Sequence, residues 1–385
     1  MTRTSSIPGV AALMVAHCAG MVDLVALPVW VGTLIGRYGL DPQQAGLLAT
    51  LFLAGAVVAS SALAPVFHRV SWRLVATAGF AVAAGSFWWA SGSAAFSTLA
   101  LCHALAGMAT GAALSVTHGT IARSAHPHRL FAGVGAALGV FAVVFLGATP
   151  PLVERLGGPV LFAVFAGVMA VAAVVSLLAF PVPDRALGPA HEDAAPAPMP
   201  RAVWFGIAGI AGMGLVQSMT FSFLERVGTE RGFGLAAITG VLVALGVVNL
   251  FPAALAGALE RRWPARRVLQ AGPVLQALLV VVIMNSARFE PYAAAASVFA
   301  AVMIFTHTFA FGLLAQLDRS GRALAATPAM LMTGAAIGPI LGGTLVKGFG
   351  YGALGVAALL IGACALASFL RLPAPAAPRQ PQGQA

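Results

Sequence analysis

Charged side chains are scarce in this sequence. Only 8% of its 385 residues are charged, whereas 60% are hydrophobic and the mean hydropathy is +0.94. These values lie far outside the range of soluble globular domains, so a water-soluble core is excluded. Apolar stretches of about 20 residues recur along the whole length, and each is long enough to cross about 30 Å of hydrocarbon as a helix. The composition therefore predicts an all-α integral membrane protein.

Cysteine and the common enzyme motifs are also missing. The three cysteines, Cys18, Cys102 and Cys364, all fall inside predicted spans, which excludes a disulfide framework and a thiol metal motif. There is no Gly-x-x-x-x-Gly-Lys-Ser/Thr loop for ATP, no His-Glu-x-x-His zinc motif and no Gly-x-Ser-x-Gly elbow. We therefore expect no enzyme, no metal site and no cofactor.

Hydropathy and the positions of the charged residues between apolar stretches predict twelve helical spans. They lie near residues 9–35, 45–67, 74–93, 96–121, 130–152, 159–181, 201–224, 234–258, 267–286, 291–316, 324–347 and 351–371. The predicted organisation is an N-terminal six-helix bundle (1–182), a Pro- and Ala-rich cytoplasmic linker (183–200), a C-terminal six-helix bundle (201–371) and a cytoplasmic tail (372–385).

The basic residues predict the orientation. If the N-terminus is cytoplasmic, 15 of the 21 basic residues lie inside and six lie outside, as the positive-inside rule requires. This topology explains the net charge of +10, so no nucleic-acid partner is expected. The three tyrosines then lie at outer ends and the six tryptophans near an interface. We expect a bacterial inner-membrane protein that retains its first helix and has both termini in the cytoplasm.

The two predicted bundles share landmarks at nearly one spacing. Residues 37–40 match residues 231–234 at an offset of 194, whereas Arg69 and Arg73 fall on Arg262 and Arg266, and Gly157 on Gly350, at an offset of 193. Landmarks spread over four loops favour a duplicated six-helix unit.

This pattern resembles the major facilitator superfamily, whose loop signature is Gly-x-Leu-x-Asp-Arg-x-Gly-Arg-Arg. Residues 64–73 keep only its two arginines, and residues 257–266 keep Gly, Leu and two Arg. Residues 103–111 match the Arg-x-x-x-Gly-x-x-x-Gly motif of proton-coupled drug exporters with His for Arg, and residues 334–343 carry the whole antiporter signature Gly-x-x-x-Gly-Pro-x-x-Gly-Gly. The resemblance implies two six-helix halves, with helices 1, 4, 7 and 10 around a central cavity and one chain sufficient for function.

Asp23 is the only acidic residue predicted to lie well inside a span. Because a carboxylate there costs at least about 2.5 kcal/mol, it is a candidate for proton coupling, with a packing clamp as the alternative. His103 lies at a comparable depth in helix 4 and is its predicted partner. Thr110 and His118 share a polar stripe with His103 on that helix, so they are expected to line the cavity.

In the second half, candidates come from helices 7, 8 and 10. Gln217, Thr220 and His307 are expected to line the cavity, and Asn249 is a further candidate whose alternative role is bonding between helices. Four arginines in the basic loops are expected to act in a cytoplasmic gate, or simply to set topology: Arg69, Arg73, Arg262 and Arg266.

Together these features predict a proton-coupled secondary transporter of a small solute, with the lipid bilayer and the proton as its other partners. Export of a drug-like or organic compound is slightly favoured, and uptake of an organic acid or other metabolite is the alternative. His17 with Met21 and Met303 with His307 supply soft ligands at i, i+4 spacing, which leaves a copper transporter as a weaker reading. A membrane receptor or scaffold is the non-transport alternative.

Overall fold

The computed structural model describes residues 3–184, 199–260, 262–318 and 327–373, so Arg261 and most of the linker and tail lie outside the described residues. The helices are α1 (Ile7–Gly20), α2 (Val22–Tyr38), α3 (Pro42–Leu63), η1 (Ala64–Arg69), α4 (Trp72–Ser91), α5 (Phe96–Ala122), α6 (Pro127–Leu156), α7 (Pro159–Ala179), α8 (Arg201–Glu230), α9 (Leu235–Val248), α10 (Pro252–Leu259), α11 (Ala265–Asn285), α12 (Phe289–Leu317), α14 (Thr327–Phe349) and α15 (Gly352–Leu370). In the described part of the chain the only β-type pairing is one bridge between Arg3 and Val182.

The all-α membrane fold predicted from composition is confirmed. Eleven helical stretches are long and apolar enough to cross a membrane, and α14, with 23 residues, occupies the place of the remaining predicted span. Two of the spans are interrupted. The first consists of α1 and α2, which are separated only by Met21, and the eighth consists of α9 and α10, where Pro252 lacks the N–H that would continue the helix.

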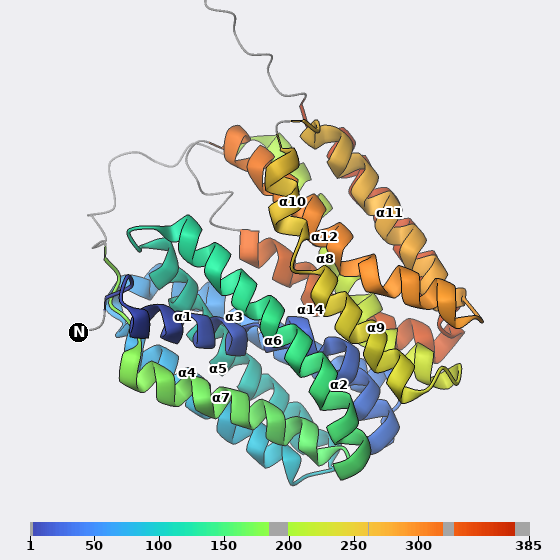
Figure 1. Ribbon diagram of the computed structural model, residues 1–385, viewed down its shortest axis with the longest axis horizontal. Coiled ribbons are helices and arrows are strands. Elements are labelled where there is room, and N and C mark those ends of the chain that lie inside the picture. The colour runs from blue at the N-terminus through green and yellow to red at the C-terminus, as the bar shows by residue number, and fades with distance from the viewer. Residues whose placement is uncertain (1–2, 185–198, 261, 319–326, 374–385) are drawn as a thin grey trace, which may run out of the picture.

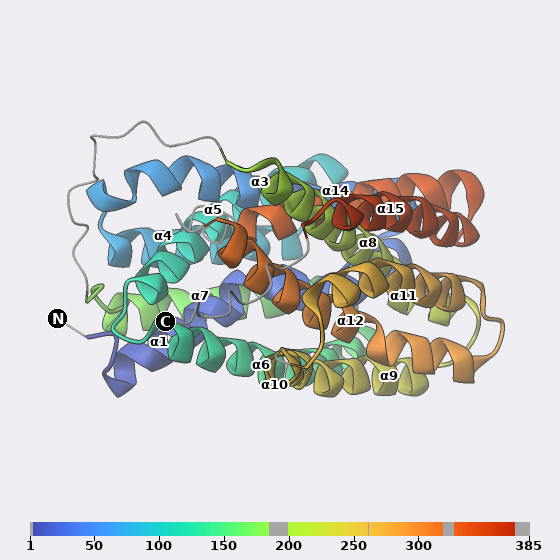
Figure 2. The same cartoon turned by 90° about the horizontal axis from the view of Figure 1, so that it is seen from above.

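We call α1–α7 the N-terminal half and α8–α15 the C-terminal half. Within the N-terminal half α5 packs on α3 and α4, and α4 packs on α7; within the C-terminal half α14 packs on α8, and α11 packs on α12 and α15. Among the described residues the halves touch mainly through three helix pairs, α3 with α14, α2 with α8 and α6 with α9. Figures 1 and 2 show the N-terminal half in blue to green and the C-terminal half in yellow to red.

The duplicated loops each have a glycine with positive φ at the corresponding position. Gly39 and Gly232 have φ of 65° and 74°, and Gly157 and Gly350 have φ of 88° and 76°. Both pairs are 193 residues apart, so the structural offset is 193 at the first loop as well, one residue less than the sequence match of residues 37–40 indicated. Glycine at the end of a helix supplies the positive φ that ends it, which explains why these landmarks persist in both halves.

Trp30 corrects the expectation that every tryptophan lies near an interface. It is fully buried in the N-terminal half and lies eight residues before Tyr38, about 12 Å deeper along α2. Its ring packs against Phe52, Phe87 and Phe165. An indole can occupy a protein core when its N–H has a partner, and here it has one.

Candidate functional site

The two ends of the molecule differ in how the halves meet. We call the end that carries Thr4, Asp184 and Arg201 the linker end, which the basic residues predict to be cytoplasmic, and the end that carries Tyr38 and Phe349 the far end. Among the described residues, contacts between the halves extend from the middle of the molecule to the far end. A Cβ on Gly46 would come within 2.1 Å of the Pro339 carbonyl oxygen, and a Cβ on Gly343 would come within 2.2 Å of the Pro42 carbonyl oxygen. No side chain larger than hydrogen fits at these two crossings of α3 and α14.

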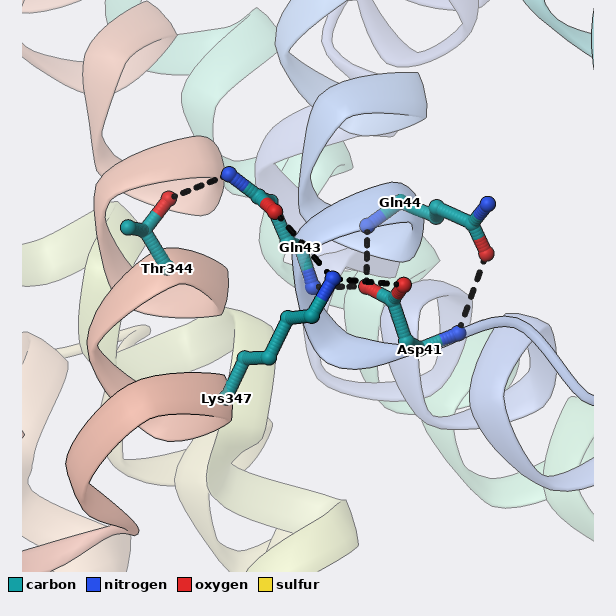
Figure 3. Close-up of polar contacts among 5 residues, drawn as sticks. All are labelled: Asp41, Gln43, Gln44, Thr344 and Lys347. Carbon is teal, nitrogen blue, oxygen red and sulfur yellow. Dashed lines mark hydrogen bonds and ion pairs between the residues drawn. The ribbon is translucent and has the colours of Figure 1, made fainter.

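A polar cluster joins the halves at the far end (Figure 3). Lys347 Nζ of α14 donates to Asp41 Oδ2 at 3.0 Å and to Gln43 Oε1 at 3.4 Å, and Gln43 Nε2 donates to Thr344 Oγ1 at 3.3 Å. Asp41 Oδ1 also accepts from the backbone N–H of Gln43 and Gln44 at 2.9 and 3.0 Å, so Asp41 caps α3 while it binds Lys347. Partial burial works to raise the pKa of Asp41, but these N–H groups and the Lys347 ammonium hold it below its usual value.

Glu225 forms a second contact between the halves, one that was not predicted because the span expected there ended at residue 224. It lies within α8, half-buried, and Thr229 Oγ1 donates to its carboxylate at 2.7 Å. A Cβ on Gly32 of α2 would come within 1.9 Å of Glu225 Oε2, so the carboxylate lies directly on the α2 backbone. The sequence signal was the spacing of Gly32 and Gly36, which leaves one face of α2 free of side chains for a close neighbour.

At the linker end the described polar contacts stay within one half. Asp184 accepts from Thr4 Oγ1 and from the Ala125 N–H at 2.9 Å, and all three residues belong to the N-terminal half. Figure 1 shows α6 running from the upper left down beside α9, with α10 near the top of the picture. Among the described residues, the polar contacts between the halves thus lie toward the far end.

Asp23 lies at the interruption of the first span. It is the second residue of α2, near the middle of the 32-residue stretch Ile7–Tyr38, and its side chain is buried. The carboxylate lies close to the backbone N–H groups of Asp23 and Leu24. These belong to the first turn of α2, whose N–H groups have no partner within the helix and favour a negative charge. No described residue forms an ion pair with Asp23.

His103 does not join Asp23 in this structure, which corrects the predicted pairing. Trp30 Nε1 donates to His103 Nε2 at 3.2 Å, and His103 Nδ1 bonds the Leu99 carbonyl oxygen at 2.6 Å. A neutral imidazole protonated on Nδ1 satisfies both bonds. His103 is fully buried, with the rings of Phe87 and Phe162 edge-on to it. It is a core residue of the N-terminal half, and its partner Trp30 was not anticipated.

Thr110 lies in the same core, because its helix approaches α3 too closely to leave a cavity on that side. A Cβ on Gly107 would come within 2.0 Å of the Phe52 carbonyl oxygen, and one on Gly111 within 2.4 Å of that of Ala56. Thr110 is 1% exposed, and its only described polar neighbour is Met169 Sδ at 3.9 Å. The part of α5 that carries His103 and Thr110, which was predicted to line the cavity, is therefore a packing surface within the N-terminal half.

His118, further along the same helix, pairs with a residue that the sequence reading had considered only for copper. His17 Nδ1 of α1 and His118 Nε2 of α5 are 3.0 Å apart, and the ring centroids are 5.1 Å apart. One nitrogen of each ring faces the other, so one ring donates and the other accepts in a single hydrogen bond. Among the described residues no group of three His, Cys, Asp or Glu side chains converges to hold a metal ion.

In the C-terminal half Gln217 is tied to a residue that the sequence reading did not consider. Gln276 Nε2 of α11 donates to Gln217 Oε1 and to the Met213 carbonyl oxygen, both at 3.2 Å, and both glutamines are buried. Thr220 is also buried, and its hydroxyl donates to the Val216 carbonyl oxygen at 2.7 Å. The Gln217 amide nitrogen has no described hydrogen bond in this arrangement.

Two further candidates carry buried polar atoms without a partner. Asn249 ends α9 at the interruption of the eighth span, and its Oδ1 is buried with no hydrogen bond. Nδ1 of His307 in α12 is likewise buried and unbonded, although the Met303 carbonyl lies close by, and its ring packs on Phe311. Because most buried polar atoms in proteins are hydrogen-bonded, such exceptions often mark places for water or a ligand.

Two of the four predicted gate arginines bind helix ends within their own half. Arg73 donates to the Leu178 carbonyl oxygen near the end of α7 at 2.7 Å, and Arg266 donates to that of Leu370 at the end of α15 at 3.4 Å. These contacts are counterparts in the two halves. Arg69 lies exposed at the end of η1 and Arg262 is exposed beside α10. No described contact of Arg73 or Arg266 crosses between the halves.

Comparisons with known proteins agree with this architecture. The sequence model of the Major Facilitator Superfamily matches residues 12–317. A bacterial homolog of the human lysosomal transporter Spinster, solved in an inward-facing and unoccupied conformation, is 13% identical, with 94% of each chain covered and a TM-score of 0.65. A mutant of the nucleoside transporter NupG is 12% identical, with 94% of this chain and 98% of that chain covered and a TM-score of 0.72. No curated protein sequence matches the chain.

Proposed function

Because the chain belongs to the major facilitator superfamily and is a multi-pass membrane transporter rather than an enzyme, we propose that it moves a small organic solute by proton-coupled alternating access. The observation that carries this proposal is the asymmetry between its ends. The halves meet through Asp41, Gly32 and Gly343 at the far end, while the described polar contacts at the linker end stay within one half. Breaking the first set would open the far end without disturbing either half.

Asp23 remains our candidate for the coupling group. It is an acid in the middle of a span, at a helix interruption, with no ion-pair partner among the described residues. An intramembrane carboxylate of this kind has little reason to stay ionised unless an aqueous path reaches it. Alternating exposure would let it take a proton from one side and release it to the other. His17 lies six residues before Asp23 along the first span and is hydrogen-bonded to His118.

The solute would be held mainly by the C-terminal half. Gln217, Asn249 and His307 supply an amide donor, a carbonyl acceptor and a ring nitrogen that no described residue satisfies. That set suits a neutral or weakly polar organic compound better than a metal ion, which requires three or more converging ligands. Export of such a compound from a bacterial cytoplasm across the inner membrane is the direction we favour, with both termini cytoplasmic as the basic residues predict.

A current measurement tests the transport proposal. The purified chain is reconstituted in proteoliposomes on a solid-supported membrane, and a library of organic solutes is screened for currents that depend on an imposed ΔpH. We expect at least one class of solute to evoke such a current. Solute-evoked flux that is indifferent to ΔpH would refute proton coupling, and the absence of flux across a broad library would favour the receptor or scaffold alternative.

The role of Asp23 is then tested with the identified solute. Asp23→Asn mimics the protonated carboxyl, so we expect it to keep exchange of solute but to lose uphill accumulation driven by ΔpH. Glu290→Gln is the control, because it neutralises an exposed acid whose ion pair with Arg288 stays within one half. Full ΔpH-driven accumulation by Asp23→Asn would make Asp23 a helix cap and leave the coupling group unassigned.

A further inference from the structure

A groove runs along the C-terminal half, and only residues of that half line it. Its walls come from α10 and the end of α9 on one side and from α11 on the other, and its floor is one face of α12. Its volume is about 830 Å³. Neither α9 nor α10 packs closely on α11, which leaves the floor of α12 uncovered between them. We call this the α11 groove.

The groove is apolar along its length. Phe251 and Leu255 line one wall, Leu275 lines the other, and Val302 lies on the floor. Phe251, Leu255 and Leu275 are 63%, 52% and 48% exposed, although each lies within a span or at its interruption. Exposed apolar side chains at this depth face lipid rather than water.

One end of the groove is basic. Arg262, Trp263 and Arg267 line it at the linker end, and both arginines are exposed. No described acidic residue forms an ion pair with either guanidinium. The Trp263 ring packs on Phe305 of the floor with centroids 5.8 Å apart, and tryptophan at this level is typical of a membrane interface.

The dimensions match one leaflet of a bilayer. Arg267 and Leu279, both on α11, mark the two ends of the lining and are twelve residues apart, which is about 18 Å along a helix. Half of a hydrocarbon core of about 30 Å is about 15 Å. A chain that begins at the two arginines would therefore reach close to the middle of the membrane inside the groove.

We propose that the α11 groove binds a phospholipid with an anionic headgroup, whose phosphate is held by Arg262 and Arg267 and whose acyl chain lies on Val302 and Phe305. Two unpaired guanidiniums beside an apolar channel complement a ligand that is anionic at one end and hydrocarbon along the rest. If the linker end is cytoplasmic, as the basic residues predict, this lipid belongs to the cytoplasmic leaflet. The site is separate from the proposed solute site, because Gln217 does not line it.

Native mass spectrometry of the detergent-purified full chain tests the site. The probes are phosphatidylglycerol, phosphatidylethanolamine with the same acyl chains, and inorganic phosphate. We expect one phosphatidylglycerol to bind more tightly than the zwitterionic lipid, and inorganic phosphate alone not to bind. The double variant Arg262→Gln with Arg267→Gln should weaken phosphatidylglycerol about 30-fold, from about five-fold for each arginine near the membrane surface.

Two further variants separate the groove from simple surface charge. Ala271→Trp fills the wall and Val302→Trp fills the floor, so either variant that folds should lose the same lipid. Arg288→Gln, at an exposed arginine before α12, is the matched charge control and should bind like the unaltered chain. Binding that survives a folded groove-filling variant, or that Arg288→Gln weakens equally, would overturn the proposal. A dimer that Ala271→Trp dissociates would assign the groove to a second copy of the chain instead.

Discussion

The two halves share a helix plan but treat the histidines within their spans differently. In the N-terminal half His103 is bonded through both ring nitrogens, and His17 is bonded to His118. In the C-terminal half His307 Nδ1 and Asn249 Oδ1 are buried without a hydrogen bond, whereas the unbonded buried side-chain atoms described in the N-terminal half are all hydroxyls, those of Tyr38, Thr77, Ser124 and Ser176. A satisfied network is rigid, whereas an unsatisfied atom stabilises the protein only when water or a ligand reaches it. The comparison suggests that the first half provides a fixed frame and that the second half provides the adaptable contacts for the solute.

The largest loss of stability should come from changing Trp30, which lies in the core of the N-terminal half. Trp30→Ala removes a fully buried indole and should cost about 3–5 kcal/mol of stability. Trp30→Phe keeps a ring but leaves His103 Nε2 unpaired, so it should cost about 1–3 kcal/mol. Thermal unfolding of the detergent-purified variants measures both effects.

Phe223 provides the control, because it stands 193 residues after Trp30, is equally buried in α8, and has no polar atom to lose. Phe223→Leu should cost less than about 1.5 kcal/mol. If Trp30→Phe proved as harmless as Phe223→Leu, the hydrogen bond to His103 would not be what holds the frame, and the contrast between the halves would rest on packing alone.

The fold was predictable because it depends on long-range averages of the sequence. Hydropathy over about 20 residues located the spans, most of them to within a few residues at each end, and glycines such as Gly157 and Gly350 marked the same loop in both halves. The Asp23–His103 pairing was not predictable in this way. The pairing depended on which face of α5, the fourth span, meets α3. A backbone contact as close as that of Gly107 with Phe52 leaves no periodic signal in so apolar a chain.

The inter-half contacts were missed for a similar reason. Glu225 fell just beyond the predicted end of its span at residue 224, whereas α8 extends six residues further, to Glu230. Lys347 and Asp41 are 306 residues apart, and only the folded structure brings them together. Boundaries of elements and pairings across the whole chain are the features that local sequence patterns specify least.

A smaller effect should distinguish the paired arginines at the linker end. Arg73→Gln removes a charge-assisted bond of 2.7 Å to the end of α7 and should cost about 1 kcal/mol, because the site is exposed. Arg266→Gln removes a bond of 3.4 Å, at the limit of useful geometry, and should cost less than about 0.5 kcal/mol. Melting temperatures should fall by about 2 °C for the first and by less for the second.

Transport by the same two variants separates stability from gating. If these arginines only fasten helix ends, the transport rate of the folded protein should change little in either variant. A strong loss of transport in Arg73→Gln without a change in melting temperature would support the gate role that the family resemblance implied.

The smallest expected effect concerns the only described ion pair that crosses between the halves, Lys347 with Asp41. An ion pair this exposed contributes about 0.2–1 kcal/mol, so Lys347→Met should raise the population open at the far end by at most about five-fold. Because the pKa of Asp41 is lowered in the closed state, the ion pair stabilises closure above the ordinary carboxyl pKa of about 3.9 and loses that effect as the pH falls through the lowered pKa. Asp41→Asn should therefore abolish whatever acid-induced opening the ion pair causes.

Distances between spin labels at Leu156→Cys and Phe349→Cys, with Cys364 replaced by Ser, measure the opening, since both labelled positions are exposed at the far end in opposite halves. Glu290→Gln is the control, because it breaks an exposed pair with Arg288 that stays within one half. Equal spin-label distances in Lys347→Met, Glu290→Gln and the unaltered chain would show that the glycine contacts of α3 with α14, rather than charge, keep the far end closed.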